Sequence, residues 1–172
     1  MATWYLGKLK YQKEDEAGSL KTITEAYLVD AVSYTDAEAR IFEIMASNTP
    51  DFQITSLNKM KLSEVFNEEN GAETWYKGKV VFISFDEKTQ KEKKTPHIML
   101  INAETPKEAY EGLVKNLGNL NDYQITDINL TPILEVVPYE PENEMLKHGN
   151  FKPVSEVMAA LNPVETVTET VE

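Results

Sequence analysis

Residues 51–58 read Asp-Phe-Gln-Ile-Thr-Ser-Leu-Asn, and residues 122–129 read Asp-Tyr-Gln-Ile-Thr-Asp-Ile-Asn, so one motif occurs twice with a displacement of 71 residues. The same displacement relates Thr-Trp-Tyr-Leu-Gly-Lys-Leu at residues 3–9 to Thr-Trp-Tyr-Lys-Gly-Lys-Val at residues 74–80. Two separated matches in one register, which include the rare residue Trp, indicate an internal repeat. The sequence therefore predicts a tandem duplication.

A helix is predicted between the two motifs of each repeat. Thr35 and Thr105 each begin a Thr-x-x-Glu pattern, in which the hydroxyl and the carboxylate bind free amides at a helix start. Pro106 suits the first helical position, because its missing N–H has no helical partner there. The predicted helices cover residues 36–47 and 106–117.

The remaining segments of each repeat alternate in polarity or are rich in β-branched residues, which predicts strands. The expected first strands are 3–11 and 74–85, the second strands are near 23–32 and 97–103, and the long third strands are 52–66 and 123–137. Polar hairpin loops are expected at 12–21 and 86–95. Because the third strands break strict alternation, we expect a bulge in each, with Pro132 at that bulge or at an edge.

The predicted fold class is therefore α+β, a tandem duplication of a ββαβ unit that forms antiparallel sheet with two helices packed on one side. The domains are a first repeat at 1–70, a second repeat at 71–138 and an irregular tail at 139–172. The tail carries seven acidic and two basic residues and contains several prolines. It holds one short helical candidate, Ser155 to Leu161.

The Trp-Tyr-x-Gly-Lys opening, the capped helix and the Asp-aromatic-Gln-Ile-Thr strand resemble an uncharacterised family over roughly residues 1–137. That family is a domain of unknown function found mostly in Bacteroidetes genomes and their phages. The resemblance implies a bacterial or phage source and an intracellular setting. It brings no activity, cofactor or catalytic residue.

Catalytic and metal-binding patterns are missing from the sequence. There is no cysteine, which excludes thiolate chemistry and Cys-based metal sites. His97 and His148 have no His or Cys at ligand spacing, and no Gly-x-Ser-x-Gly elbow is present. Glu64 and Glu135 are the candidates for acid–base catalysis, but they recur because the unit recurs, and solvated strand residues explain them. We therefore expect no enzyme activity, no metal and no cofactor.

Gly7 and Gly78 stand alone inside predicted strands, without the neighbouring glycines of a phosphate-binding loop. A bulge or a closely packed aromatic neighbour explains an isolated strand glycine better.

Aromatic residues interleaved with lysine make up the candidate binding face: Trp4, Tyr5, Lys8, Trp75, Tyr76 and Lys79. Such a face resembles a stacking platform for single-stranded nucleic acid. The alternative interpretation is that the rings pack in the core or between the units while the lysines are solvated.

The net charge of −12 opposes binding to nucleic acid or to an anionic membrane. No apolar stretch is long enough to cross a membrane, so a cytoplasmic protein is expected. A duplicated fold presents two similar surfaces, which suits a protein partner or self-association. The primary hypothesis is thus a non-enzymatic protein-binding or assembly module. The alternatives are a single-stranded nucleic-acid-binding module and an acidic nucleic-acid mimic that inhibits a DNA-binding host protein.

Overall fold

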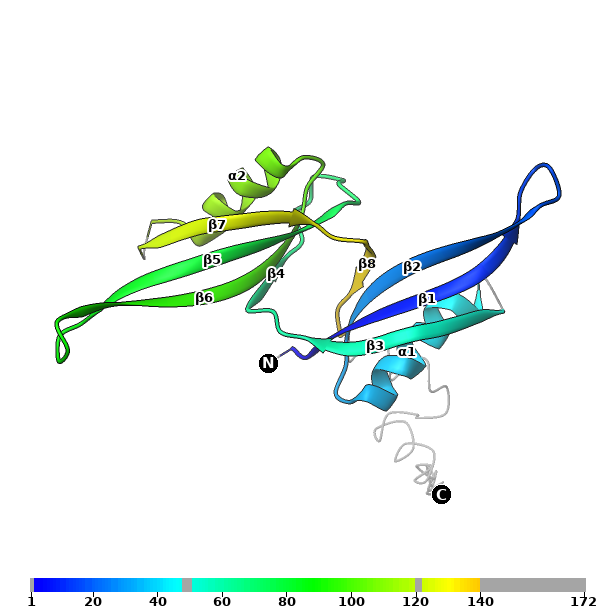
Figure 1. The fold of residues 1–172 in the computed structure, drawn as a ribbon, viewed down its shortest axis with the longest axis horizontal. Coiled ribbons are helices and arrows are strands. Elements are labelled where there is room, and N and C mark those ends of the chain that lie inside the picture. Colours follow the sequence, from blue (N-terminus) through cyan, green and yellow to red (C-terminus); the bar gives the residue numbers. More distant parts are fainter. Residues whose placement is uncertain (1, 48–50, 120–121, 140–172) are drawn as a thin grey trace, which may run out of the picture. The chain divides into compact units, whose positions relative to one another are not determined.

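The computed structural model describes residues 2–47, 51–119 and 122–139, and residues 1–139 form one compact unit. The fold is α+β (Figure 1). Its strands and helices, in chain order, are β1 (Trp4–Glu14), β2 (Leu20–Asp30), α1 (Tyr34–Ala46), β3 (Phe52–Met60), β4 (Glu64–Phe66), β5 (Trp75–Asp86), β6 (Lys91–Asn102), α2 (Pro106–Leu117), β7 (Tyr123–Leu130) and β8 (Ile133–Val137). The predicted tail helix from Ser155 to Leu161 lies outside the described residues.

The strands form two four-stranded sheets, each with its own helix, instead of antiparallel sheet with both helices on one side. The first sheet has the order β3-β1-β2-β8 and carries α1, whereas the second has the order β4-β6-β5-β7 and carries α2 (Figure 1). The two strand orders are the same if β1, β2, β3 and β8 of the first sheet correspond to β5, β6, β7 and β4 of the second. Most neighbours are antiparallel, but each sheet ends in one parallel pair.

The short strands β4 and β8, here called the crossing strands, account for the difference from the expected fold. Each long third strand is interrupted, the first at residues 61–63 and the second at residues 131–132, where Pro132 cannot donate to a ladder. β4 then pairs in parallel with β6, and β8 pairs in parallel with β2. The chain thus passes from the first sheet to the second after β3 and returns after β7.

The predicted bulges are present in β3 and β7. The register of β3 on β1 shifts between Lys8 and Leu9, which leaves Thr55 as the extra residue. The equivalent shift in β7 leaves Thr126 as the extra residue. The Thr55 hydroxyl donates to the Lys8 carbonyl at 3.1 Å, so the repeated Ile-Thr places isoleucine beside the core and threonine at the bulge.

Both helices begin with a side-chain cap, but the first cap differs from the prediction. The Thr105 hydroxyl accepts from the Glu108 amide and Pro106 is the first helical residue, as expected. In α1 the cap is Ser33, whose hydroxyl accepts from the Asp36 amide at 3.1 Å, and Thr35 lies inside the first turn. The Ser-x-x-Asp pattern at 33–36 therefore starts the helix two residues before the position that we predicted.

Each helix packs closely on its own sheet at a strand glycine. A Cβ at Gly7 would collide with Ile41 Cδ1, and one at Gly78 would lie 2.6 Å from Leu113 Cδ1. The close neighbours are aliphatic helix side chains, instead of the predicted bulge or aromatic ring. Ile41 and Leu113 are fully buried, and burial of one such side chain contributes about 1.5–3 kcal/mol.

A third apolar cluster contains residues of both sheets. Its buried members are Leu28, Trp75, Leu100 and Ile133. Partly buried residues such as Trp4, Leu6 and Val65 pack against it. This cluster includes residues from both crossing strands, so the crossing strands contribute to the core that contains residues of both sheets. Within the described part of the chain, no helix has the length and apolar character needed to span a membrane.

Candidate functional site: a groove beside strand β4

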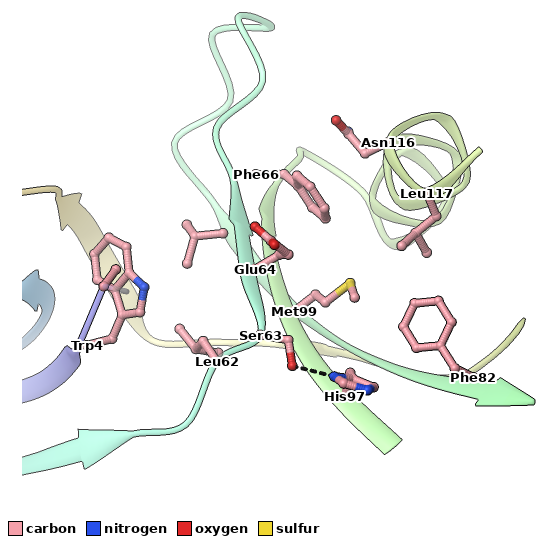
Figure 2. A pocket seen from close by; sticks show the side chains of 12 residues that line it. Trp4, Leu62, Ser63, Glu64, Phe66, Phe82, His97, Met99, Asn116 and Leu117 are labelled. Atoms are coloured by element: carbon pink, nitrogen blue, oxygen red, sulfur yellow. Dashed lines mark hydrogen bonds between the residues drawn. The ribbon is translucent and has the colours of Figure 1, made fainter. Parts of the chain in front are cut away.

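A groove of about 1020 Å³ lies beside the crossing strand β4. Helix α2 packs on β5, β6 and β7, and the β4 edge of the same sheet face remains accessible. The groove is lined by Ala2, Trp4, Leu62, Ser63, Glu64, Val65, Phe66, Phe82, His97, Met99, Asn116 and Leu117 (Figure 2).

Aromatic and aliphatic side chains form much of the groove wall. Phe66 comes from β4, Phe82 from β5 and Leu117 from the end of α2 (Figure 2). Phe82 meets the His97 ring edge-on, with the ring centroids 5.1 Å apart. Trp4, from β1 of the first sheet, completes the lining. Partly buried rings beside exposed polar groups are typical of surfaces that bind another molecule.

Ser63 and His97 form the polar pair of the groove. Ser63 Oγ lies 2.7 Å from His97 Nδ1 (Figure 2). The Ser63 amide donates to the Ile98 carbonyl at 2.8 Å. Nucleophilic catalysis by such a pair also needs a third group that orients the histidine. Among the described residues, no hydrogen bond joins His97 Nε2 to a carboxylate. The two bonds instead fasten the crossing segment 61–63 to β6.

The segment between β4 and β5 is held in place by the buried side chain of Asn102. Its Oδ1 accepts from the Glu68 amide at 2.7 Å, and its Nδ2 lies within hydrogen-bond distance of oxygens of Glu68, Asn70 and Ala72. In the first sheet the equivalent residue, opposite Trp4 in the register, is Asp30. The Asp30 carboxylate accepts from the amide of Thr3 at 2.9 Å.

The same segment is tied to α2 by the side chain of Glu68. Its carboxylate accepts from the side-chain Nδ2 of Asn116 at 2.5 Å and from the Lys115 ammonium at 2.9 Å. The hydrogen bond from Asn116, and then that from Lys115, lowers the pKa of Glu68. This anchor holds Asn116 at the rim of the groove.

The first sheet carries a different polar group at the position of His97. Glu25 faces Leu9 in the register as His97 faces Val80. The hydroxyls of Tyr11 and Tyr27 each donate to one Glu25 oxygen at 2.8 Å. Burial, followed by the hydrogen bond to Glu25, raises the pKa of Tyr27, and the hydrogen bond to Glu25 raises that of Tyr11. The two sheets therefore share a backbone plan but differ in side-chain chemistry.

The structure does not bring the residues of the sequence-predicted binding face together. Tyr5 and Tyr76 lie in the cores beneath the two helices, and Trp75 belongs to the cluster that contains residues of both sheets. Trp4 is half-buried beside that cluster and lines the groove. Lys8 and Lys79 are exposed.

Sequence reasoning missed the Ser63–His97 pair and the groove around it. The two residues are 34 positions apart, and Ser63 falls inside what was predicted as one continuous strand. Glu64 was considered as an acid–base candidate, and it lines the groove as an exposed residue of β4. The short stretch Leu62-Ser63-Glu64 gave no periodic signal of its own. Among the described residues, no group of three or more His, Asp or Glu side chains has a geometry that could hold a metal ion.

The family described as Domain of unknown function (DUF4494) matches residues 3–139, which include every described helix and strand. The chain belongs to this family. The resemblance to a family of unknown function is thereby confirmed. No curated protein and no solved structure matches the chain.

Proposed function

We propose that this protein is a non-enzymatic protein-binding module whose groove beside β4 receives a segment of a protein partner. The observation that carries the proposal is the groove itself, which is large and bordered by the exposed residues Ser63, Glu64 and Asn116. Phe66, Phe82 and other apolar groups supply the contact area that anchors a partner side chain. The polar rim supplies hydrogen bonds that orient it.

We also propose that the two sheets arose by tandem duplication of one ββαβ unit. The support is the 71-residue displacement, the matching strand orders, and the same bulged threonine in β3 and β7. In this view Asp30 and Asn102, and likewise Glu25 and His97, are equivalent positions that have diverged.

The non-enzymatic part of the proposal rests on what the Ser63–His97 pair lacks. A serine nucleophile needs an oriented base and donors for the developing oxyanion. Both hydrogen bonds of Ser63 instead stabilise the entry to β4. A nucleic-acid platform has less support, because Trp75 and Tyr76 are only 6% exposed and offer no ring face to a base.

The test is affinity capture from a bacterial lysate, with and without nuclease, using the wild type and two groove variants. Glu64→Lys changes the rim and Phe66→Ala removes a wall. Glu111→Lys, on the exposed side of α2, is the matched control, and circular dichroism checks that each variant folds. We expect a nuclease-resistant protein partner that the control retains and both groove variants lose.

Two results would contradict the proposal. The groove would not be the binding site if both variants retained the partner as well as the wild type does. Capture that disappeared with nuclease, with nucleic acid recovered instead of protein, would favour the nucleic-acid alternative.

A further inference from the structure

The edge of the first sheet beyond β8 is open. β8 pairs with Ala26 to Val29 of β2, and the preceding residues, 20–25, have no strand partner on that side in the described part of the chain. The Ala31 amide donates to the Thr3 carbonyl, so odd-numbered residues of β2 direct their backbone groups toward β1. The N–H and C=O groups of Thr22 and Thr24 therefore point outward.

The equivalent edge of the second sheet is protected against strand addition. By the same alternation, even-numbered residues of β6 point outward, and the Ile98 carbonyl indeed accepts from Ser63 on that side. Pro96 is the next outward residue and has no N–H to offer. Lys91, Lys93 and Lys94 add charge along the same stretch. Proline and lysine are the usual means by which proteins block edge pairing.

We propose that the open β2 edge binds the β2 edge of a second copy of this chain, in antiparallel register about a twofold axis at Ile23. This inference rests on the proposed protein-binding and assembly role and names one partner for it. The pairing joins Thr22 of each copy to Thr24 of the other, and each antiparallel pair exchanges two N–H···O bonds. An isologous contact of this kind closes as a dimer.

Charge favours a second copy as the occupant. In this register Lys21 of one copy lies opposite Glu25 of the other, twice by symmetry, and both side chains lie on the helix-bearing face of the sheet. Although the whole chain carries −12, residues 8–25 carry four lysines and four acidic residues. The two hairpins therefore approach each other without the net repulsion that the rest of the chain would impose.

The length of the paired stretch is limited by β8. Ile133 of β8 already occupies the outward edge at Ala26, so the ladder between the two copies covers residues 21–25 of each. Leu20, which is 69% exposed, lies just beyond the end of this ladder.

The experiment is light scattering coupled to size-exclusion chromatography over a concentration series of the full chain. The wild type should form a dimer. Thr22→Pro removes an outward N–H that has no partner among the described residues, so it should give a folded monomer. Thr22→Val keeps the N–H and should remain dimeric. Lys21→Glu should weaken dimerisation roughly tenfold, because it places like charges opposite each other twice.

A wild-type monomer over the whole series would overturn the inference, as would a folded Thr22→Pro or Lys21→Glu variant that dimerises as the wild type does. The Lys21→Glu variant decides the question if Thr22→Pro fails to fold. If the wild type is a monomer that still captures a partner through the β4 groove, the proposed dimer is wrong but the proposed function stands. A monomer that captures no protein would overturn both the dimer and the proposed function.

Discussion

Replacement of Asn102 by Asp should destabilise the protein, because the side-chain amide donates to oxygen atoms that a carboxylate would repel. Asn102 is 4% exposed, and its Nδ2 lies 2.9 Å from the Glu68 carbonyl and 3.2 Å from oxygens of Asn70 and Ala72. The substitution removes two N–H donors, and each buried acceptor left unsatisfied costs about 1–3 kcal/mol. We expect a loss of about 3 kcal/mol in the free energy of unfolding at neutral pH.

The assay is urea denaturation followed by tryptophan fluorescence, repeated near pH 4 and near pH 8. A protonated carboxyl group regains one donor, so the introduced Asp should have a raised pKa in the folded state. The penalty of the Asn102→Asp variant should therefore grow as the pH rises through that pKa. The matched control is Asp30→Asn at the equivalent position of the first sheet. There one oxygen accepts from the Thr3 amide, and an amide oxygen can replace it at a cost below about 1 kcal/mol.

Equal losses in the two variants would refute this reasoning, as would an Asn102→Asp protein as stable as the wild type. Hydrogen exchange provides an independent measurement. The amide of Glu68, which donates to Asn102 Oδ1, should lose protection in the Asn102→Asp variant before the strands of the second sheet do.

Three further predictions concern other buried or hydrogen-bonded positions. Gly78→Ala should lower the free energy of unfolding by about 1–3 kcal/mol, measured by urea denaturation, because the added Cβ would overlap Leu113. The loss should be smaller in a Leu113→Ala background. A Gly78→Ala protein as stable as the wild type would argue against close packing of the helix on the sheet. The neutral Tyr27 hydroxyl donates a hydrogen bond to Glu25, and the pKa of Tyr27 is raised in the folded state. The stabilisation from this hydrogen bond is therefore present below pH 10 and is lost as the pH rises through the folded-state pKa. In an ultraviolet titration Tyr27 should ionise late, and Glu25→Gln should bring it earlier. Because the pKa of Glu68 is lowered in the folded state, its contribution to stability is present above its unfolded-state pKa of about 4.3 and is lost as the pH falls through the folded-state pKa. Glu68→Gln should therefore reduce the dependence of the free energy of unfolding on pH in this acidic range. An unchanged pH dependence would contradict this prediction.

Much of the secondary structure follows from local patterns that the sequence displays. The 71-residue displacement located the first and third strands of each half, and the loss of alternation in the third strands indicated a bulge in each, which the structure places at Thr55 and Thr126. The start of α2 was predictable because Thr105 and Pro106 are adjacent and each fits a single helix-terminal position. These features depend on neighbouring residues, which sequence reasoning handles well.

The start of α1 was less certain from the sequence because two hydroxyl residues compete for it. Ser33 and Thr35 are each followed three residues later by an acid. In the structure Ser33 is the cap, and the helix that it starts buries Ala37, Ile41 and Met45. The two patterns are locally equivalent, so the sequence alone did not distinguish between them.

The crossing strands and the groove could not be predicted from the sequence. A strand as short as Glu64–Phe66 has no measurable periodicity, and nothing within it specifies whether it pairs with its own sheet or with the other. The alternation of β1 did carry information, since it places Trp4 and Tyr5 on opposite faces. The burial of Trp75 depends on a cluster that combines residues of both sheets with residues of the crossing strands, which are distant in the sequence.

The crossing strands also govern the order in which this chain can mature during synthesis. The first three strands of one sheet leave the ribosome early, but the strand that completes that sheet is Ile133–Val137. Until it emerges, the Ala26–Val29 edge is unprotected and Ile133 is missing from the shared cluster. Nearly the whole of the second sheet must be translated before the first is finished. The nascent protein therefore passes through a period in which the Ala26–Val29 edge can pair with other chains, and the last few residues before Pro138 close that part of the edge.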